Sequence, residues 1–143
     1  MGVTIESKNC SIDMGCGGFN NLRIKVAELA ADDIGKHYKR LEESLLLFGA
    51  EERSKFFKEY DKITMELDKK YNGEMSEVLD FLYASDCGAE MPVKVCEKVY
   101  EVIKDYDDNV CYGYIGRKDC AMFKDFKELV KDCIDNKCSM KWW

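Results

Sequence analysis

The spacing of eight cysteines in a chain of 143 residues most constrains what this chain can fold into. The cysteines are Cys10, Cys16, Cys87, Cys96, Cys111, Cys120, Cys133 and Cys138. None of them forms the Cys-x-x-Cys pair of a zinc knuckle or a thioredoxin-type redox site. Under cytosolic conditions we expect all eight thiols to be reduced and to behave as small hydrophobic residues. A zinc site assembled across the fold, for example from Cys10 and Cys16 with a later pair, remains an alternative.

The length of the chain limits the number of domains, and its charge limits the kinds of partner. A chain of this length supports one sizeable hydrophobic core, so we predict a single domain over residues 1–143. The net charge of −6 argues against direct nucleic-acid binding, which needs clustered Lys and Arg. It favours a protein partner instead, and a basic protein is one candidate. The first residues lack the pattern of a signal peptide, and no apolar run reaches the roughly 18 residues of a membrane span. We therefore expect a cytoplasmic protein without membrane association.

Apolar residues recur every three or four positions through most of the chain, which is typical of helices. The clearest case is the segment 51–71, and the same pattern predicts helices over residues 19–29, 32–48, 76–84, 92–106 and 119–133, the last capped by Asp119. Residues 110–115 fit either a short strand or an aromatic loop. We predict a mainly α, single compact domain of five to six helices. At most a minor strand element is expected, at the N-terminus, near residues 110–115 or at the C-terminus.

The acidic residues at 105–109 match the first ligand positions of a calcium-binding loop. Asp105, Asp107 and Asn109 stand at relative positions one, three and five of an EF-hand loop. Val110 then replaces the required Gly, and Gly116 replaces the closing Glu. We interpret the segment as a solvated turn.

Nucleophilic catalysis by Cys or Ser needs a base, and the single histidine is His37, which lies between Lys36 and Lys39. We interpret it as a partly exposed structural residue. The run Gly15–Gly18 before a helix lacks the Lys-Ser/Thr ending of a phosphate-binding loop. The sequence thus assigns no catalytic residue, no metal ligand and no cofactor, and we expect a protein that is not an enzyme.

Two short motifs are more specific than composition. One is the turn Ser85-Asp86-Cys87 between two predicted helices, and the other is Gly18-Phe19-Asn20-Asn21-Leu22-Arg23. With these motifs the chain resembles an uncharacterised family of small bacterial and mobile-element proteins. Members usually have His before Ser-Asp-Cys, where this chain has Ala84. The resemblance implies no activity.

Aromatic residues and one arginine near the C-terminal end give the candidate contact residues, which are Tyr112, Tyr114, Arg117, Trp142 and Trp143. Their types are enriched in binding hot spots, although each could instead fill the core, and at least one tryptophan should be docked. We expect a non-enzymatic interaction protein that occludes or sequesters a protein partner, as an anti-CRISPR inhibitor or a toxin-immunity protein does. A cysteine-dependent zinc-binding domain and a thiol enzyme are the alternatives.

Overall fold

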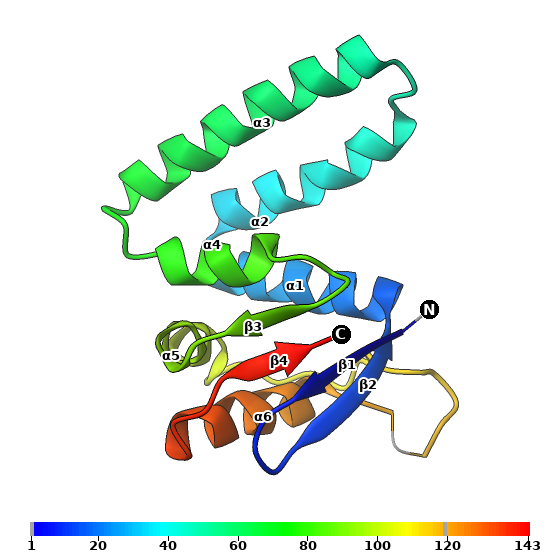
Figure 1. Ribbon diagram of the computed structural model, residues 1–143, viewed down its shortest axis with the longest axis vertical. Coiled ribbons are helices and arrows are strands. Elements are labelled where there is room, and N and C mark those ends of the chain that lie inside the picture. The colour runs from blue at the N-terminus through cyan, green and yellow to red at the C-terminus, as the bar shows by residue number, and fades with distance from the viewer. Residues whose placement is uncertain (1, 119) are drawn as a thin grey trace.

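The computed structural model describes residues 2–118 and 120–143, and helices account for most of this part of the chain (Figure 1). The helices are α1 (Cys16–Ala30), α2 (Asp32–Lys39), the 3-10 helix η1 (Arg40–Leu46), α3 (Ala50–Lys70), α4 (Ser76–Tyr83), α5 (Val93–Ile103) and α6 (Phe123–Asp135). The prediction of a mainly α fold is confirmed. The segment 32–48 is not one α-helix, because it changes to 3-10 geometry at Arg40. Asp119, predicted to cap the last helix, lies outside the described residues.

The sheet is larger than the predicted minor element. It contains β1 (Gly2–Glu6), β2 (Ser11–Gly15), β3 (Ala89–Met91) and β4 (Met140–Trp142). These strands form one antiparallel sheet in the order β2-β1-β4-β3, so the two ends of the chain pair with each other (Figure 1). The prediction from the sequence underestimated the sheet, because β3 and β4 have three residues each, which is too few for an alternating pattern of apolar and polar residues. The segment 110–115 forms only an isolated bridge, between Cys111 and Met122.

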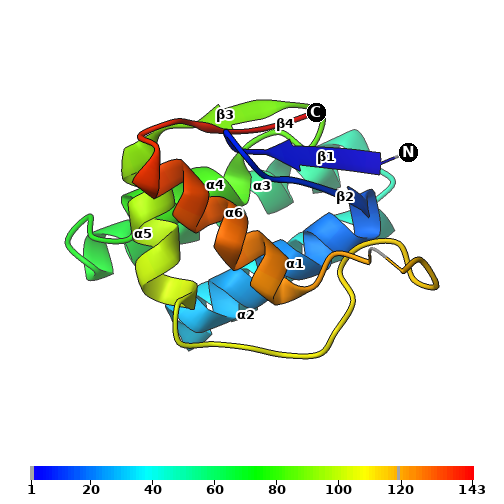
Figure 2. The same ribbon diagram turned by 90° about the horizontal axis from the view of Figure 1, so that it is seen from below.

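One face of the sheet is buried and the other faces away from the helices. Alternate strand residues turn inward, namely Val3, Ile5, Met14, Met140 and Trp142. The strands of the sheet pack on α1, α5 and α6, and Figure 2 shows the sheet as a layer on one side of these helices. Figure 1 shows that α2 and α3 lie beyond α1, on the side away from the sheet. The core is therefore a layer of side chains between the sheet and the helices behind it.

The hairpin of α2, η1 and α3 forms an arm that extends from this body (Figure 1). His37 joins the two sides of the arm, because its Nε2 lies 2.8 Å from Thr64 Oγ1 and its ring stacks on Tyr60 at 3.8 Å. The Tyr60 hydroxyl lies 2.7 Å from the Tyr83 hydroxyl of α4, which ties the arm to the body. His37 is therefore buried and not partly exposed as predicted. Burial, and next the charge of Arg40, lower its pKa.

Across the described residues, the helices are too short or too polar for any of them to span a bilayer.

Candidate protein-binding site

The five candidate contact residues divide between the core and the surface. Tyr112 is 5% exposed and Trp142 is 2% exposed. The Tyr112 hydroxyl donates a hydrogen bond to Asp108 at 2.7 Å, and Trp142 Nε1 donates one to the Ser85 carbonyl at 2.8 Å. These two residues belong to the core, which corrects their assignment to a contact surface. The docking of one terminal tryptophan is confirmed.

Tyr114 reaches the surface beside the N-terminal end of β1. Gly2 and Gly15 are opposite each other in the β1–β2 pair, and their lack of side chains leaves room for this tyrosine. A Cβ added at Gly2 would lie 2.0 Å from the Tyr114 hydroxyl. The Arg117 guanidinium lies 4.7 Å from the centre of the Tyr114 ring, in cation–π geometry. Two of the predicted contact residues therefore form one stacked pair.

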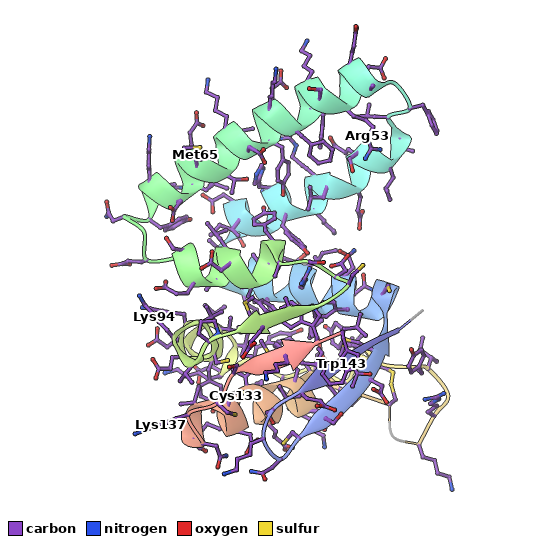
Figure 3. The ribbon with its side chains drawn as sticks, in the orientation of Figure 1. Arg53, Met65, Lys94, Cys133, Lys137 and Trp143 are labelled. Carbon is purple, nitrogen blue, oxygen red and sulfur yellow. A yellow bond between two sulfur atoms is a disulfide. The ribbon has the colours of Figure 1, made fainter. Side chains whose placement is uncertain are left out.

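Trp143 lies at the C-terminal end of the chain, directly after β4 (Figure 3). Its backbone exchanges two hydrogen bonds with Thr4, of 3.0 and 3.2 Å, and its side chain is 56% exposed. Gly2 precedes Thr4 by two positions on the same face, so it is a diagonal neighbour of Trp143, roughly 7 Å away. We name Tyr114, Arg117 and Trp143 together the aromatic surface.

A groove of about 650 Å³ adjoins the aromatic surface along β2. Residues 9–13 line it on one side, and Tyr114, Arg117, the segment 120–122 and the first turns of α6 line it on the other. The groove thus lies between the edge of the sheet and the loop 111–122.

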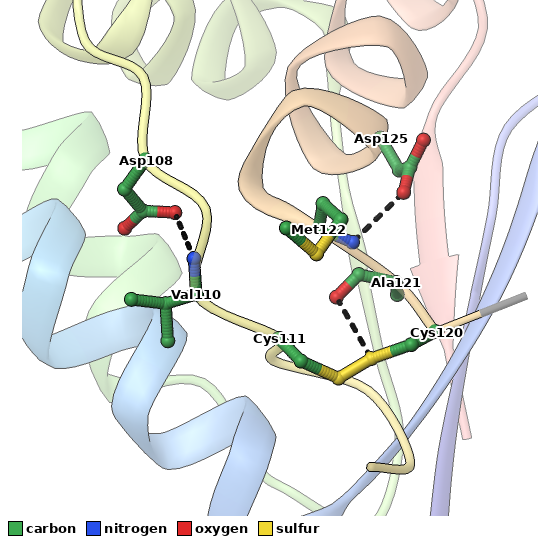
Figure 4. Close-up of a disulfide and its surroundings, with 7 residues drawn as sticks. All are labelled: Asp108, Val110, Cys111, Cys120, Ala121, Met122 and Asp125. Atoms are coloured by element: carbon green, nitrogen blue, oxygen red, sulfur yellow. Dashed lines mark hydrogen bonds between the residues drawn. A yellow bond between two sulfur atoms is a disulfide. The ribbon is translucent and has the colours of Figure 1, made fainter. Parts of the chain in front are cut away.

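A disulfide between Cys111 and Cys120 closes this loop (Figure 4). The backbone N–H groups of Tyr112 and Gly113 both donate to the Ala121 carbonyl, at 2.9 and 3.0 Å. The Met122 N–H donates to the Asp125 carboxylate at 2.8 Å, which fixes the entry into α6 (Figure 4). The expectation that all eight thiols are reduced is corrected, because tertiary folding brings these two cysteines to a Cα separation of 6.1 Å.

The two motifs of the family resemblance, Gly18–Arg23 and Ser85–Cys87, contact each other through Arg23 and Asp86. Arg23 of α1 is 3% exposed and its guanidinium lies 4.2 Å from the centre of the Phe19 ring. Its Nη1 contacts the Asp86 carboxylate at 2.7 Å, and Trp142 contacts the neighbouring Ser85. The Ser-Asp-Cys turn is therefore held in place by contacts with the core.

The remaining thiols divide between interior and surface. Cys96 and Cys133 are buried between α5 and α6, and Cys87 is exposed. Hydrogen bonding with Cys96, and then burial, raise the pKa of the Cys133 thiol, which keeps it protonated. Across residues 2–118 and 120–143, no group of three or more His, Cys, Asp or Glu side chains is arranged to hold a metal ion.

The tip of the arm exposes apolar residues that the sequence analysis did not select. Leu45, Leu46 and Phe48 are 73%, 74% and 92% exposed. The sequence signal for these residues is the run of four consecutive apolar residues from Leu45 to Phe48. Consecutive residues point to different sides of a helix, so such a run cannot be buried on one helix face.

Comparison with protein-family models, curated proteins and solved structures gives no match to this chain.

Proposed function

We propose that this chain is a non-enzymatic interaction protein that binds a protein partner through the aromatic surface and the adjoining groove, and so occludes part of that partner. The carrying observation is that Tyr114 and Arg117 stack beside the groove, and that the backbone of Trp143 pairs with Thr4, two residues from the Gly2 position against which the Tyr114 hydroxyl lies. Tyr, Trp and Arg are the residue types that most often dominate binding energy.

Restraints on the backbone of this region support the proposal. The disulfide and the bonds to Ala121 restrain the loop that carries Tyr114 and Arg117, and β1 holds Trp143 by two backbone hydrogen bonds. A backbone that is already restrained loses less conformational entropy on binding, which leaves more of the contact energy as affinity.

The experiment is partner capture from the source cell with matched variants, quantified by mass spectrometry. Arg117→Ala and Trp143→Ala should each reduce recovery of the same protein at least tenfold, as expected for hot-spot residues worth about 2 kcal/mol. Met65→Ala is the control, because Met65 is exposed on the arm and distant in the fold from the aromatic surface (Figure 3).

Thermal denaturation separates binding from folding in the same variants. If Arg117→Ala and Trp143→Ala retain full capture while both proteins remain folded, the aromatic surface is not the binding site. Loss of capture in Met65→Ala alone would place the site on the arm.

A further inference from the structure

We infer that the arm contains a pH-sensitive contact, and that mild acid detaches α3 from α2 while the body of the protein stays folded. The contact is the buried His37, which joins the two helices. This inference is independent of the aromatic surface and goes beyond the proposed function. His37 is the one histidine in the sequence, and histidine is the side chain whose ordinary pKa allows it to change charge between pH 5 and 8.

α3 is only lightly attached to the rest of the fold. It is the helix farthest from the sheet (Figure 1), and within the described residues Tyr60 is the only one of its 21 residues that is buried. The buried residues of the main hydrophobic core, as far as the structure describes them, all lie outside α3. α2, by contrast, packs along α1 and contributes Ile34 and Tyr38 to that core. A segment with few buried contacts opens at a lower free energy than the whole fold, so α3 can separate without loss of the core.

The hydrogen bonds around His37 assign its protonation state. Thr64 Oγ1 donates its proton to the Tyr60 carbonyl at 3.0 Å, so it accepts the hydrogen bond from His37 Nε2 at 2.8 Å. The ring then carries its proton on Nε2, and Nδ1 is the unprotonated nitrogen. Across residues 2–118 and 120–143 the buried Nδ1 has no hydrogen-bond partner. The closed arm therefore holds a neutral imidazole.

Protonation of His37 would place an unpaired donor and a charge in this interface. The second proton would bind Nδ1, and the new N–H would be buried without an acceptor, which is unfavourable. Arg40 opposes a positive imidazole, and the smaller effect of Asp61 in α3 favours it. Tyr60 and Tyr83 stay neutral in acid, because burial raises the pKa of both phenols. Opening of the arm brings the ring into water and removes the unfavourable burial.

Other contacts hold α3 at the two ends of the arm, and they keep their charge in mild acid. At the tip, the Arg53 guanidinium donates to two backbone carbonyls at 3.3 and 3.5 Å. At the opposite end, Lys70 Nζ and the Tyr71 hydroxyl contact the Asp33 carboxylate at 2.5 and 2.7 Å. The hydrogen bond from Lys70, and next that from Tyr71, lower the pKa of Asp33, so this carboxylate stays ionised. His37 is therefore the contact that titrates.

The difference between the open and the closed arm gives the direction and the size of the effect. In the open arm His37 is solvated and has its ordinary pKa of 6.5, whereas burial, and next the charge of Arg40, lower its pKa in the closed arm. The closed arm is therefore stabilised above pH 6.5, and this stabilisation is lost as the pH falls below that value. Between pH 6.5 and the lowered pKa, the ratio of open to closed arm rises by up to about tenfold per pH unit.

Hydrogen exchange followed by NMR measures the opening, with each amide rate corrected for its intrinsic pH dependence. From about pH 7 to about pH 5.5, protection of α3 amides such as that of Ile63 should fall about threefold or more. Protection of α6 amides such as that of Leu129 should change by less than about twofold. Tryptophan fluorescence, which comes from Trp142 and Trp143 in the body, should stay the same. Constant protection of α3, or an equal fall in α6, overturns the inference.

Two variants separate His37 from other effects of acid. His37→Gln has a neutral side chain that can still donate to Thr64, so protection of α3 should no longer depend on pH. Asp33→Asn is the matched control, because it removes the ion pair with Lys70 and should lower α3 protection by the same factor at both pH values.

The results for these variants decide the inference. An unchanged pH dependence in His37→Gln, or its loss in Asp33→Asn, overturns the inference. If His37→Gln does not fold, NMR titration of the His37 ring in the unmodified protein replaces it. A midpoint below 6.5 together with the fall in α3 protection then supports the inference, and a midpoint at or above 6.5 overturns it.

Discussion

Replacing Asp86 by alanine tests whether the Ser-Asp-Cys turn is structural. The Asp86 side chain is 68% exposed, and removal of so exposed a residue ordinarily changes the free energy of unfolding by less than about 0.5 kcal/mol. Its partner Arg23 is 3% exposed, and within residues 2–118 and 120–143 no group accepts a hydrogen bond from Arg23 Nε or Nη2. Asp86→Ala would leave this guanidinium buried without a carboxylate.

The expected magnitude follows from these two exposures. Breaking a fully buried ion pair costs about 3–5 kcal/mol. Solvent around Asp86 reduces that value, and the rings of Phe19, Phe81 and Trp142 still stabilise the cation. We therefore expect Asp86→Ala to lower the free energy of unfolding by about 2 kcal/mol.

Urea denaturation followed by circular dichroism measures the change. Glu101→Ala is the matched control, because Glu101 is similarly exposed, at 65%, and pairs with Lys98 on the surface of α5. In an Arg23→Met background Asp86→Ala should cost less than about 0.5 kcal/mol, because the buried charge is gone. If Asp86→Ala costs no more than Glu101→Ala, Arg23 does not depend on Asp86 and the reasoning fails.

Three further predictions concern single side chains. Tyr112→Ala should lower the free energy of unfolding by about 3–5 kcal/mol in urea titrations and Tyr114→Ala by clearly less, since only Tyr112 is buried; similar losses would contradict this division. Phe48→Ser should change the free energy of unfolding by less than about 0.5 kcal/mol, because Phe48 is 92% exposed, and it should reduce self-association measured by light scattering. The lowered pKa of His37 means that the folded state favours the neutral imidazole, so its contribution to stability is present above the ordinary pKa of 6.5 and is lost as the pH falls below that value. Urea midpoints at pH 7 and pH 5 should therefore differ less in His37→Gln than in the unmodified protein, and an equal difference would count against a buried neutral histidine.

The long helices could be predicted because their signal is local. In α3, apolar residues at helical spacing begin and end almost where the segment 51–71 was predicted. The 3-10 segment η1 and the strand β3 have no such signal, since both are short, and β3 forms by pairing with β4, which is distant in the sequence.

The candidate site was predicted in its residue types and not in its arrangement. Composition indicated Tyr112 and Tyr114 equally, and likewise the two tryptophans. Pairing of β4 with β1 decides that Trp142 faces the helices and Trp143 faces outward, because successive strand residues point to opposite faces.

The sequence by itself determined the main helical segments, the net negative charge and the residue types available for contacts. These properties depend on composition and on periodicity within short windows. Tertiary structure decided the rest. It brought Cys111 to Cys120, buried His37 beneath α3 and joined the two chain ends in one sheet. Contacts between residues far apart in the sequence depend on how the whole chain packs, and local patterns carry no information about that packing.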